Sequence, residues 1–251
     1  MSQDLNLAPI TASLEVRLRA AIAPHDLLQH PFYRAWSMGQ LTLADLRAYA
    51  GQYRAQVDQL PSLLGAAQKA CGDLATRAAL ARNLAEEVGA RAPEGVPGAE
   101  AAVPHRALWL DFAAGIGADA AAVEGAAPDT ETLASAARLA ALVAAGELPA
   151  LAALWTYETQ TARVSSSKRE GLCAFYGVTD ARTTAFFTAH EGLDVLHAAD
   201  LLSGLGRAID ALPEARREAA VTDACAAASR AAQAQWLFLD GVQARRMAAA
   251  A

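Results

Sequence analysis

The chain has 251 residues, 54% of them hydrophobic, and a formal net charge of −6. Lys and Arg are spread without a basic block, which argues against nucleic acid or an anionic membrane surface as a partner. The three cysteines are odd in number and form no CxxC pair, so a reducing compartment is favoured over a disulfide framework. The most apolar run is interrupted by Glu147 and Pro149 and reads as buried helix ends, and the first residues lack a signal-peptide pattern. We therefore expect a cytoplasmic protein that does not cross a membrane.

The sequence pattern is helical nearly throughout. Ala and Leu dominate, β-branched residues are scarce, and no segment alternates at period two. Thr42 and Asp45 form a capping-box-like start, and Gly39, Gly89 and Gly177 act as stops. The expected helices, in chain order, cover about residues 11–23, 42–71, 73–88, 105–115, 130–146, 149–165, 166–176, 180–203 and 213 onward, with a short irregular or helical segment at 31–39.

These segments predict an all-α protein, one bundle of seven or eight helices. Residues 89–104 are rich in Gly and Pro and form the one clear loop. Neither an internal repeat nor a linker divides the pattern, so residues 1–251 are expected to form a single domain. The long Ala-rich apolar faces favour a homodimer.

The segment "AHEGLDVLHAAD" carries chemistry on an apolar helix. It places His190, Asp194 and His197 at i, i+4 and i+7, within about 60° of one another on a helix. Their flanks, "TTAFF" and "LLSGL", predict that this face is buried. Burying two imidazoles and a carboxylate costs several kcal/mol unless something coordinates them, and a divalent metal such as iron, manganese or zinc would do so. A structural polar cluster is the alternative that this pattern alone leaves open.

Further carboxylates and an imidazole lie on other expected helices. Glu86 and Glu87 end the helix of "NLAEEVG", Glu158 lies in the apolar "LAALWTYETQ", and His105 opens "HRALW". Helix bundles build dinuclear carboxylate sites from inward-facing groups of this kind, and open coordination positions there bind O2. The pattern leaves the choice between Glu86 and Glu87 open, and it excludes Glu191, which points about 100° away from its neighbour on the helix.

Four tyrosines and one lysine accompany these residues. Tyr33 lies in "HPFYRAW", Tyr49 and Tyr53 lie one turn apart in "AYAGQYRAQ", and Tyr157 precedes the glutamate of "WTYETQ". Aromatic residues at helical spacing are usually core residues, which is the alternative for each of them. Lys168 is one of only two lysines in the chain and, in "SSSKREG", reads by itself as a residue of a solvated cap.

Taken in order, these motifs resemble the haem-oxygenase-like proteins of the TenA/PqqC superfamily, in particular the branch of the Chlamydia protein associating with death domains. The resemblance covers about residues 15–205, and it rests on "HPFYRAWSMGQLTLADLRAYAGQYRAQVDQLPSLL", "RNLAEEVG", "HRALWLDFAAGIG", "WTYETQ", "SKREGLCAFYG" and "HEGLDVLHAAD". It implies a haem-oxygenase-like helical bundle with a non-haem dinuclear site, either diiron or iron–manganese. The ligands that carry over are Glu86, His105, Glu158, His190, Asp194 and His197.

The resemblance also implies an activity. Members of this branch are associated with an O2-dependent route to para-aminobenzoate for folate synthesis, in which the protein's own tyrosine supplies the ring. Tyr33 matches the tyrosine of the "HPFY" motif, Lys168 matches the lysine implicated as amine donor, and Tyr157 matches the tyrosine before the middle glutamate ligand. Such an oxidoreductase needs an external reductant and sacrifices itself in about one turnover.

One departure and three alternatives accompany this interpretation. In the family a short turn separates the first glutamate and histidine ligands, whereas here the Gly/Pro-rich segment 89–104 lies between Glu86 and His105. The first alternative is a dimetal oxidase with a free small-molecule substrate. The second is a TenA-like hydrolase of thiamin-derived pyrimidines that uses a cysteine nucleophile, although each cysteine reads as a small apolar helix residue. The third is an interaction module without catalysis, for which the sequence offers no groove motif.

Overall fold

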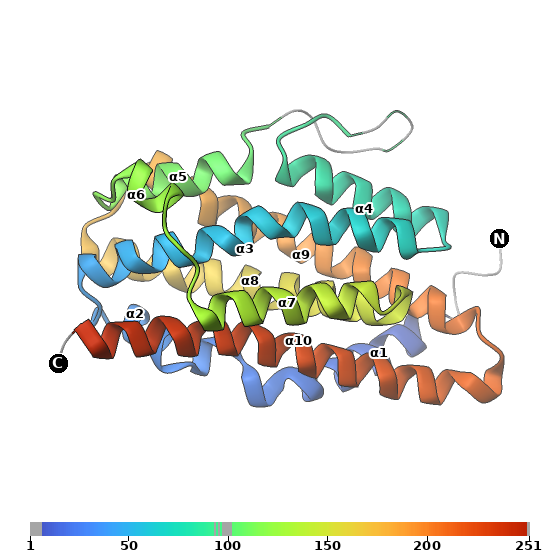
Figure 1. Cartoon of the computed structure of the whole chain (residues 1–251). Coiled ribbons are helices and arrows are strands. Elements are labelled where there is room, and N and C mark those ends of the chain that lie inside the picture. The colour runs from blue at the N-terminus through green and yellow to red at the C-terminus, as the bar shows by residue number, and fades with distance from the viewer. Residues whose placement is uncertain (1–6, 93, 95, 97–101, 250–251) are drawn as a thin grey trace.

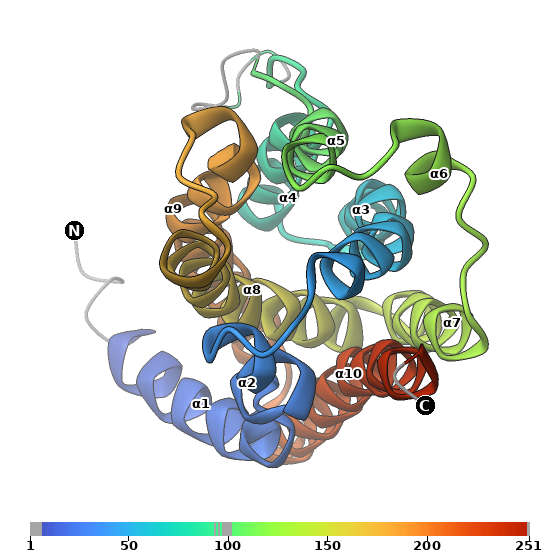
Figure 2. The same ribbon diagram turned by 90° about the vertical axis from the view of Figure 1, so that its left-hand side faces the viewer.

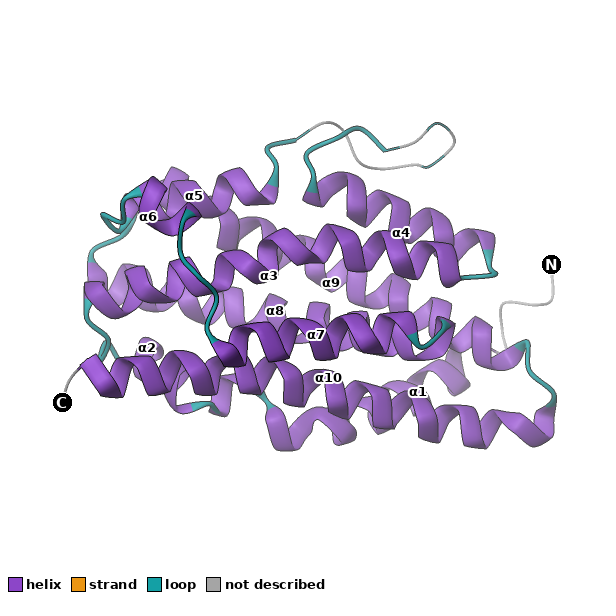
Figure 3. Ribbon diagram, in the orientation of Figure 1, coloured by secondary structure: helices purple, strands orange, loops and turns teal. Residues whose placement is uncertain are grey.

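The computed structural model describes residues 7–92, 94, 96 and 102–249, and within them every regular element is a helix (Figure 3). Figure 1 shows a bundle of long helices. In chain order the helices are α1 (Leu7–Ile22), the 3-10 turns η1 (Ala23–His25) and η2 (Leu27–Gln29), α2 (Pro31–Ser37), α3 (Leu43–Ala70), α4 (Leu74–Glu87), α5 (His105–Gly115), α6 (Ala120–Glu124), α7 (Thr130–Ala144), α8 (Glu147–Tyr176), α9 (Ala181–Asp210) and α10 (Glu214–Ala249).

The expected all-α class is confirmed, and the local signals explain several helix ends. Thr42 and Asp45 form a reciprocal capping box at the start of α3. Gly39, Gly89 and Gly177 follow the ends of α2, α4 and α8 with φ near +67°, a conformation that costs a glycine little. Each of these stops was expected from the sequence.

Two boundaries differ from the expectation. Residues 149–165 and 166–176 form one helix, α8, because serines are tolerated within a helix whose neighbouring turns pack against α9 and α10. Helix α9 continues past residue 203 to Asp210, because Gly204 packs directly against Thr76 of α4 instead of ending the helix. The described α-helices number ten, since the short α2 and α6 add to eight longer ones.

Helix α8 lies in the middle of the bundle and contacts α2, α3, α7, α9 and α10 (Figure 2). Its neighbours bury two kinds of core. One cluster is aliphatic and built mainly of Leu and Ala, and the other is aromatic and includes Trp36, Tyr49, Trp109 and Phe187. Along α9 the residues of the "AHEGLDVLHAAD" segment lie between these two cores, so polar groups on its inner face are enclosed by apolar packing.

None of the described helices combines the length and the apolar character needed to cross a membrane.

Candidate metal centre

Helix α9 presents its three polar residues inward, as the heptad-like spacing predicts. His190, Asp194 and His197 are all buried, whereas Val195 and Leu196 between them are exposed. Glu191 lies outside this face and forms an ion pair with Arg169 at 2.6 Å. The inner face of α9 therefore contributes two imidazoles and one carboxylate to the middle of the bundle.

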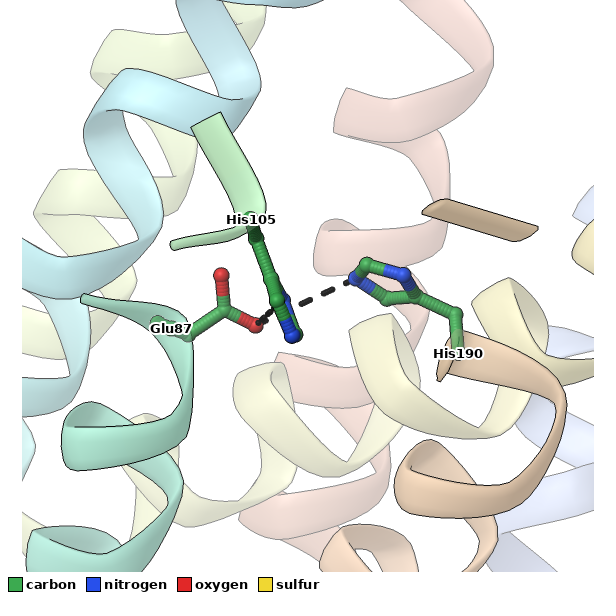
Figure 4. A group of neighbouring side chains, drawn as sticks. All are labelled: Glu87, His105 and His190. Atoms are coloured by element: carbon green, nitrogen blue, oxygen red, sulfur yellow. Dashed lines mark ion pairs between the residues drawn. The ribbon is translucent and has the colours of Figure 1, made fainter. Parts of the chain in front are cut away.

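The first group combines His190 with Glu87 and His105. Figure 4 shows the three side chains converging from α9, α4 and α5. His105 Nδ1 lies 2.8 Å from Glu87 Oε1, and His190 Nε2 lies 3.9 Å from the same oxygen. His190 Nδ1 lies 2.6 Å from the carbonyl oxygen of Phe186. A protonated Nδ1 donates a hydrogen bond to this oxygen, so Nε2 keeps a free lone pair.

The second group combines Asp194 and His197 with Glu158 of α8. His197 Nδ1 lies 3.8 Å from Glu158 Oε2 and 3.9 Å from Asp194 Oδ1. Each group offers one ligand atom per residue, and in each group these atoms lie within 4.8 Å of one another. We call Glu87, His105 and His190 the first triad, and Glu158, Asp194 and His197 the second triad.

The ionisation of these groups reflects crowded charge in an apolar interior. Burial, together with the charges of Glu158 and Glu87, raises the pKa of Asp194 well above its usual value. Burial and the charge of His105 lower the pKa of His190 to about 3, which keeps this imidazole neutral. Burial alone would lower the pKa of His197, but Glu158 and Glu86 outweigh it and raise the pKa to about 10.

A divalent cation in each triad fits these residues. Among the described residues, both oxygens of Asp194 and Nδ1 of His197 are buried without a hydrogen-bond partner. Such orphaned groups cost free energy unless they are paired. Neutral imidazole and carboxylate suit iron and manganese, and the cations would offset the repulsion that keeps Asp194 from ionising.

The two adjacent glutamates at the end of α4 face different partners. Glu87 is buried and belongs to the first triad, whereas Glu86 Oε2 lies 2.6 Å from Nε2 of His197, away from the Nδ1 that faces the second triad. Consecutive helical side chains diverge by about 100°, so both cannot enter one group. The sequence left the choice between these residues open, and this geometry favours Glu87 as the ligand in place of Glu86. His105 starts α5 directly beside it, so the long loop after Glu87 still returns the chain to the triad.

A second polar group, the tyrosine–lysine cluster of Tyr33, Tyr49, Tyr53, Tyr157 and Lys168, lies in the aromatic part of the core. Lys168 is buried, and its Nζ donates a hydrogen bond to the Tyr49 hydroxyl at 2.6 Å. The same Nζ lies 4.6 Å from the ring centroid of Tyr33, 4.8 Å from that of Tyr49 and 4.7 Å from that of Tyr53. The expectation of a solvated Lys168 is therefore wrong, because α8 continues through it and turns its side chain inward.

The hydroxyls of this cluster connect Lys168 with the second triad. The Tyr33 and Tyr49 hydroxyl oxygens are 2.9 Å apart, and those of Tyr53 and Tyr157 are 3.5 Å apart. The rings of Tyr49 and Tyr53 stack with their centroids 5.4 Å apart. Tyr157 directly precedes the triad residue Glu158 in α8, so these contacts span the space between the two polar groups.

Burial sets the protonation of the cluster. It lowers the pKa of the Lys168 amine well below its usual value and raises the pKa of Tyr33, Tyr49 and Tyr157 well above theirs. Burial likewise raises the pKa of Tyr53. Burial therefore favours the neutral form of the phenols and of the amine alike.

One further contact was not among the expectations from the sequence. Asn83 is buried, and its Nδ2 donates a hydrogen bond to Glu158 Oε1 at 2.8 Å, which orients that carboxylate toward the second triad. Asn83 lies one turn before Glu87 on α4, and this spacing is the only sequence signal that could have drawn attention to it.

Sequence comparison places the chain among redox proteins. A family described as iron-containing redox enzymes matches residues 47–236. The chain is 32% identical to a 4-aminobenzoate synthase of Nitrosomonas europaea over 243 residues, which is 92% of each chain. It is 34% identical to a 4-aminobenzoate synthase of Chlamydia muridarum over 183 residues, which cover 72% of this chain and 73% of the relative.

Solved structures share the fold. A TenA homologue from Pseudomonas syringae superposes with a TM-score of 0.73 over 91% of this chain and 92% of its own, at 14% identity. A CADD-like protein from Nostoc punctiforme superposes with a TM-score of 0.71 over 95% of this chain and 96% of its own, at 16% identity. Because the identities are low, these structures establish the haem-oxygenase-like fold and leave the activity to the sequence relatives and the site.

Proposed function

Because this chain belongs to the family of iron-containing redox enzymes, we propose that it is an O2-dependent non-haem dimetal oxidase that forms 4-aminobenzoate (para-aminobenzoate) for folate synthesis. The relatives named 4-aminobenzoate synthase support this product. The observation that carries the proposal further is the position of Lys168, a buried amine enclosed by tyrosine rings beside the two triads. In this proposal Tyr33 supplies the ring and Lys168 supplies the nitrogen.

The two triads would hold the metal ions. Glu87, His105 and His190 would bind one ion, and Glu158, Asp194 and His197 the other. Two iron ions, or one iron and one manganese ion, would supply the oxidising power of O2 there, with electrons from an external donor. The buried position of every triad residue keeps water away from this chemistry.

The chemistry of the product explains the roles of Tyr33 and Lys168. In tyrosine, Cβ and the phenol oxygen are para to each other on the ring, as the carboxyl carbon and the nitrogen are in 4-aminobenzoate. Conversion would break the Cα–Cβ bond of Tyr33, oxidise Cβ to the carboxyl group and replace the phenol oxygen by nitrogen. Transfer of that nitrogen would break the Cε–Nζ bond of Lys168, and O2 is the oxidant throughout.

Burial prepares Lys168 for this role. A neutral amine keeps the lone pair that a carbon–nitrogen bond requires, whereas a protonated one does not. Burial favours the neutral form, because it lowers the pKa of the Lys168 amine well below its usual value. The nearby ring faces and the Tyr49 hydroxyl hold its Nζ against the tyrosines.

Tyr157, Tyr53 and Tyr49 provide the route from the triads to Tyr33. Removing an electron from a neutral phenol also requires its proton to leave, and each hydroxyl here has another within 3.5 Å to take part in that transfer. The stacked rings of Tyr49 and Tyr53 join the two hydroxyl pairs. Tyr157, next to Glu158, is the first residue of this route.

Isotope labelling tests the proposal. Protein labelled with ring-13C tyrosine and side-chain-15N lysine should, after anaerobic loading with Fe(II) and addition of reductant and O2, release 4-aminobenzoate that carries both labels. Tyr33→Phe should abolish the 13C label in the product. The rings of Tyr49 and Tyr53 lie almost as close to Nζ of Lys168 as that of Tyr33 does. Tyr49→Phe and Tyr53→Phe remove hydroxyls of the route but keep the proposed source ring, so they should slow the reaction and still give a product that carries both labels. Unlabelled product from labelled protein would contradict the proposal.

A free small-molecule substrate is the second candidate, and one groove favours it. A hollow of about 300 Å³ between α1, α8 and α9 is lined by Asp194 of the second triad, by Trp155 and Thr159, and by the charged rim residues Arg19 and Arg163. Many turnovers with an intact Tyr33, blocked by Ala162→Phe at the groove wall, would establish this function instead. The cysteines lie elsewhere, with Cys71 buried in the aliphatic core, so the hydrolase alternative has no nucleophile beside the triads.

We also propose that the protein acts in the cytoplasm as a homodimer. Val195 and Leu196, adjacent exposed apolar side chains on α9, support a second copy as partner. Sedimentation of the protein at micromolar concentration tests this state, and a monomer would contradict it.

A further inference from the structure

Glu86 and Glu87 are neighbours in α4, yet they serve different parts of the centre. Glu87 faces His105 and His190 of the first triad. The side chain of Glu86 is 15% exposed and reaches His197 of the second triad, with 2.6 Å between Oε2 and Nε2. One turn of α4 is thereby linked to both triads.

The contact with Glu86 decides which nitrogen of His197 is available. An ionised carboxylate only accepts hydrogen bonds, so Nε2 carries the proton and donates it to Glu86. The other nitrogen, Nδ1, is buried without a hydrogen-bond partner and faces Glu158 and Asp194. When a cation is bound at Nδ1, the ring keeps one proton. This proton lies on Nε2 and points toward the carboxylate of Glu86.

We propose that Glu86 is a positioning residue for the second triad: it fixes His197 with Nε2–H toward the carboxylate and Nδ1 toward the metal position. This inference rests on the proposed metal centre. A carboxylate that accepts from the far nitrogen of a ligating histidine sets the orientation of the ring and raises the basicity of the coordinating nitrogen. Glu86 therefore acts through His197 and does not itself contact the ion.

The first triad is built differently, which makes the role of Glu86 specific. His190 presents Nε2 to its triad, and its Nδ1 is held by the backbone carbonyl of Phe186. A neutral carbonyl oxygen is a weaker hydrogen-bond acceptor than a carboxylate, so the ring of His197 is the more basic ligand of the two. Removing the Glu86 carboxylate should weaken the second triad and leave the first unchanged.

Metal titration of the purified protein tests this inference with Co(II), whose visible absorption reports each binding step. Wild-type protein should bind two ions. Glu86→Ala should weaken one step by about 10–100-fold, as expected for loss of a carboxylate partner of a ligating histidine. Glu86→Gln keeps an acceptor oxygen without the charge and should fall between the two, so the test stands even if the alanine variant does not fold.

Anomalous scattering from Co(II) in crystals of the same variants assigns the weakened step. The inference expects reduced occupancy at Glu158, Asp194 and His197 with full occupancy at the first triad. Glu191→Gln, a neighbour of the centre that pairs with Arg169, is the matched control and should retain both ions. Equal affinity of Glu86→Ala and wild type, or loss confined to the first triad, would overturn the inference. Because these measurements need no 4-aminobenzoate, a failed product assay with an unchanged titration would count against the proposed function alone.

Discussion

The two buried polar regions of the molecule, the pair of triads and the tyrosine–lysine cluster, differ in the sign of the charge that they bury. The triads bring several carboxylates together without a lysine or arginine among them, and burial together with the charges of Glu158 and Glu87 raises the pKa of Asp194. The tyrosine–lysine cluster holds a single amine that has no carboxylate partner in the described part of the chain, and burial lowers the pKa of this amine. The first region requires a cation from outside the chain, whereas the second satisfies its amine with phenol oxygens and ring faces.

This difference explains how one bundle could keep an oxidising centre and its reactive amine apart. In the proposed function, buried oxygens and an imidazole nitrogen without partners mark the region that would take metal, and the buried, hydrogen-bonded amine marks the region that would react. Tyr157 and Tyr53 link the two regions: burial, and after it the charges of Glu87 and Glu158, raise the pKa of both hydroxyls. The comparison implies that each region can be disabled without disturbing the other.

Lys168→Met should have the largest effect on the product. The substitution removes the proposed nitrogen source but preserves the apolar stem, so 4-aminobenzoate should fall below detection while the protein still binds two metal ions. Product analysis by mass spectrometry, together with metal analysis, checks both results. Lys69→Met, which changes the only other lysine of the chain at an exposed position, is the control and should retain product formation. Formation of 4-aminobenzoate by Lys168→Met at the wild-type level would contradict the role of Lys168 as nitrogen source.

Asp194→Asn should disable the metal centre and leave the tyrosine–lysine cluster intact. Loss of this ligand should reduce the bound metal from two ions to one and lower product formation by about 100-fold or more, since even loss of a partner behind a ligand costs about 10–100-fold. Metal analysis and the product assay measure these changes. The amine of Lys168 should keep its lowered pKa in this variant, and titration of that amine checks the independence of the two regions.

Tyr157→Phe tests the connection between them. The variant removes the hydroxyl that lies 3.5 Å from Tyr53 and keeps the ring, so both ions should still bind. Product should form about 100-fold more slowly, at the lower end of the effect of losing a proton-transfer group. Rapid-mixing kinetics after O2 addition measures the rate. An unchanged rate would remove Tyr157 from the route.

The smallest expected effect is a dependence of stability on pH, and it also arises from Lys168. Its folded-state pKa is lowered, so between that pKa and its unfolded value near 10.5 the unfolded chain binds one more proton than the folded one. The free energy of unfolding should therefore rise with pH in this window, by up to about 1.4 kcal/mol per pH unit. Urea unfolding from pH 7 to 10 should show Lys168→Met more stable than wild type, with a difference that shrinks as the pH rises. A constant difference, as expected for Lys69→Met, would contradict a neutral Lys168.

Much of the fold could be predicted because the signals are local. The capping box at Thr42 and the glycine stops depend on a few neighbouring residues, and α9 displays its inward face through simple helical spacing. The continuation of α8 through its serines could not be predicted in this way. It depends on packing against α9 and α10, which are distant in sequence from that segment.

The candidate site, like the fold, could be predicted where it depends on local spacing and not where it depends on tertiary packing. The spacing of His190, Asp194 and His197 predicts a shared face, but which glutamate of α4 joins them depends on how α4 is rotated against α9. Only the three-dimensional arrangement separates Glu87 from Glu86. The inward turn of Lys168 likewise depends on tertiary packing, because its own segment is typical of a solvated cap.

The most direct test is to count product molecules per protein chain and to map the peptides afterwards. Protein loaded with Fe(II) and exposed to reductant and O2 should yield at most one 4-aminobenzoate per chain. Peptide mass spectrometry should then find Tyr33 and Lys168 altered in the same proportion. Many product molecules per chain, with both residues intact, would contradict a self-sacrificing oxidase and assign the metal centre to a free substrate.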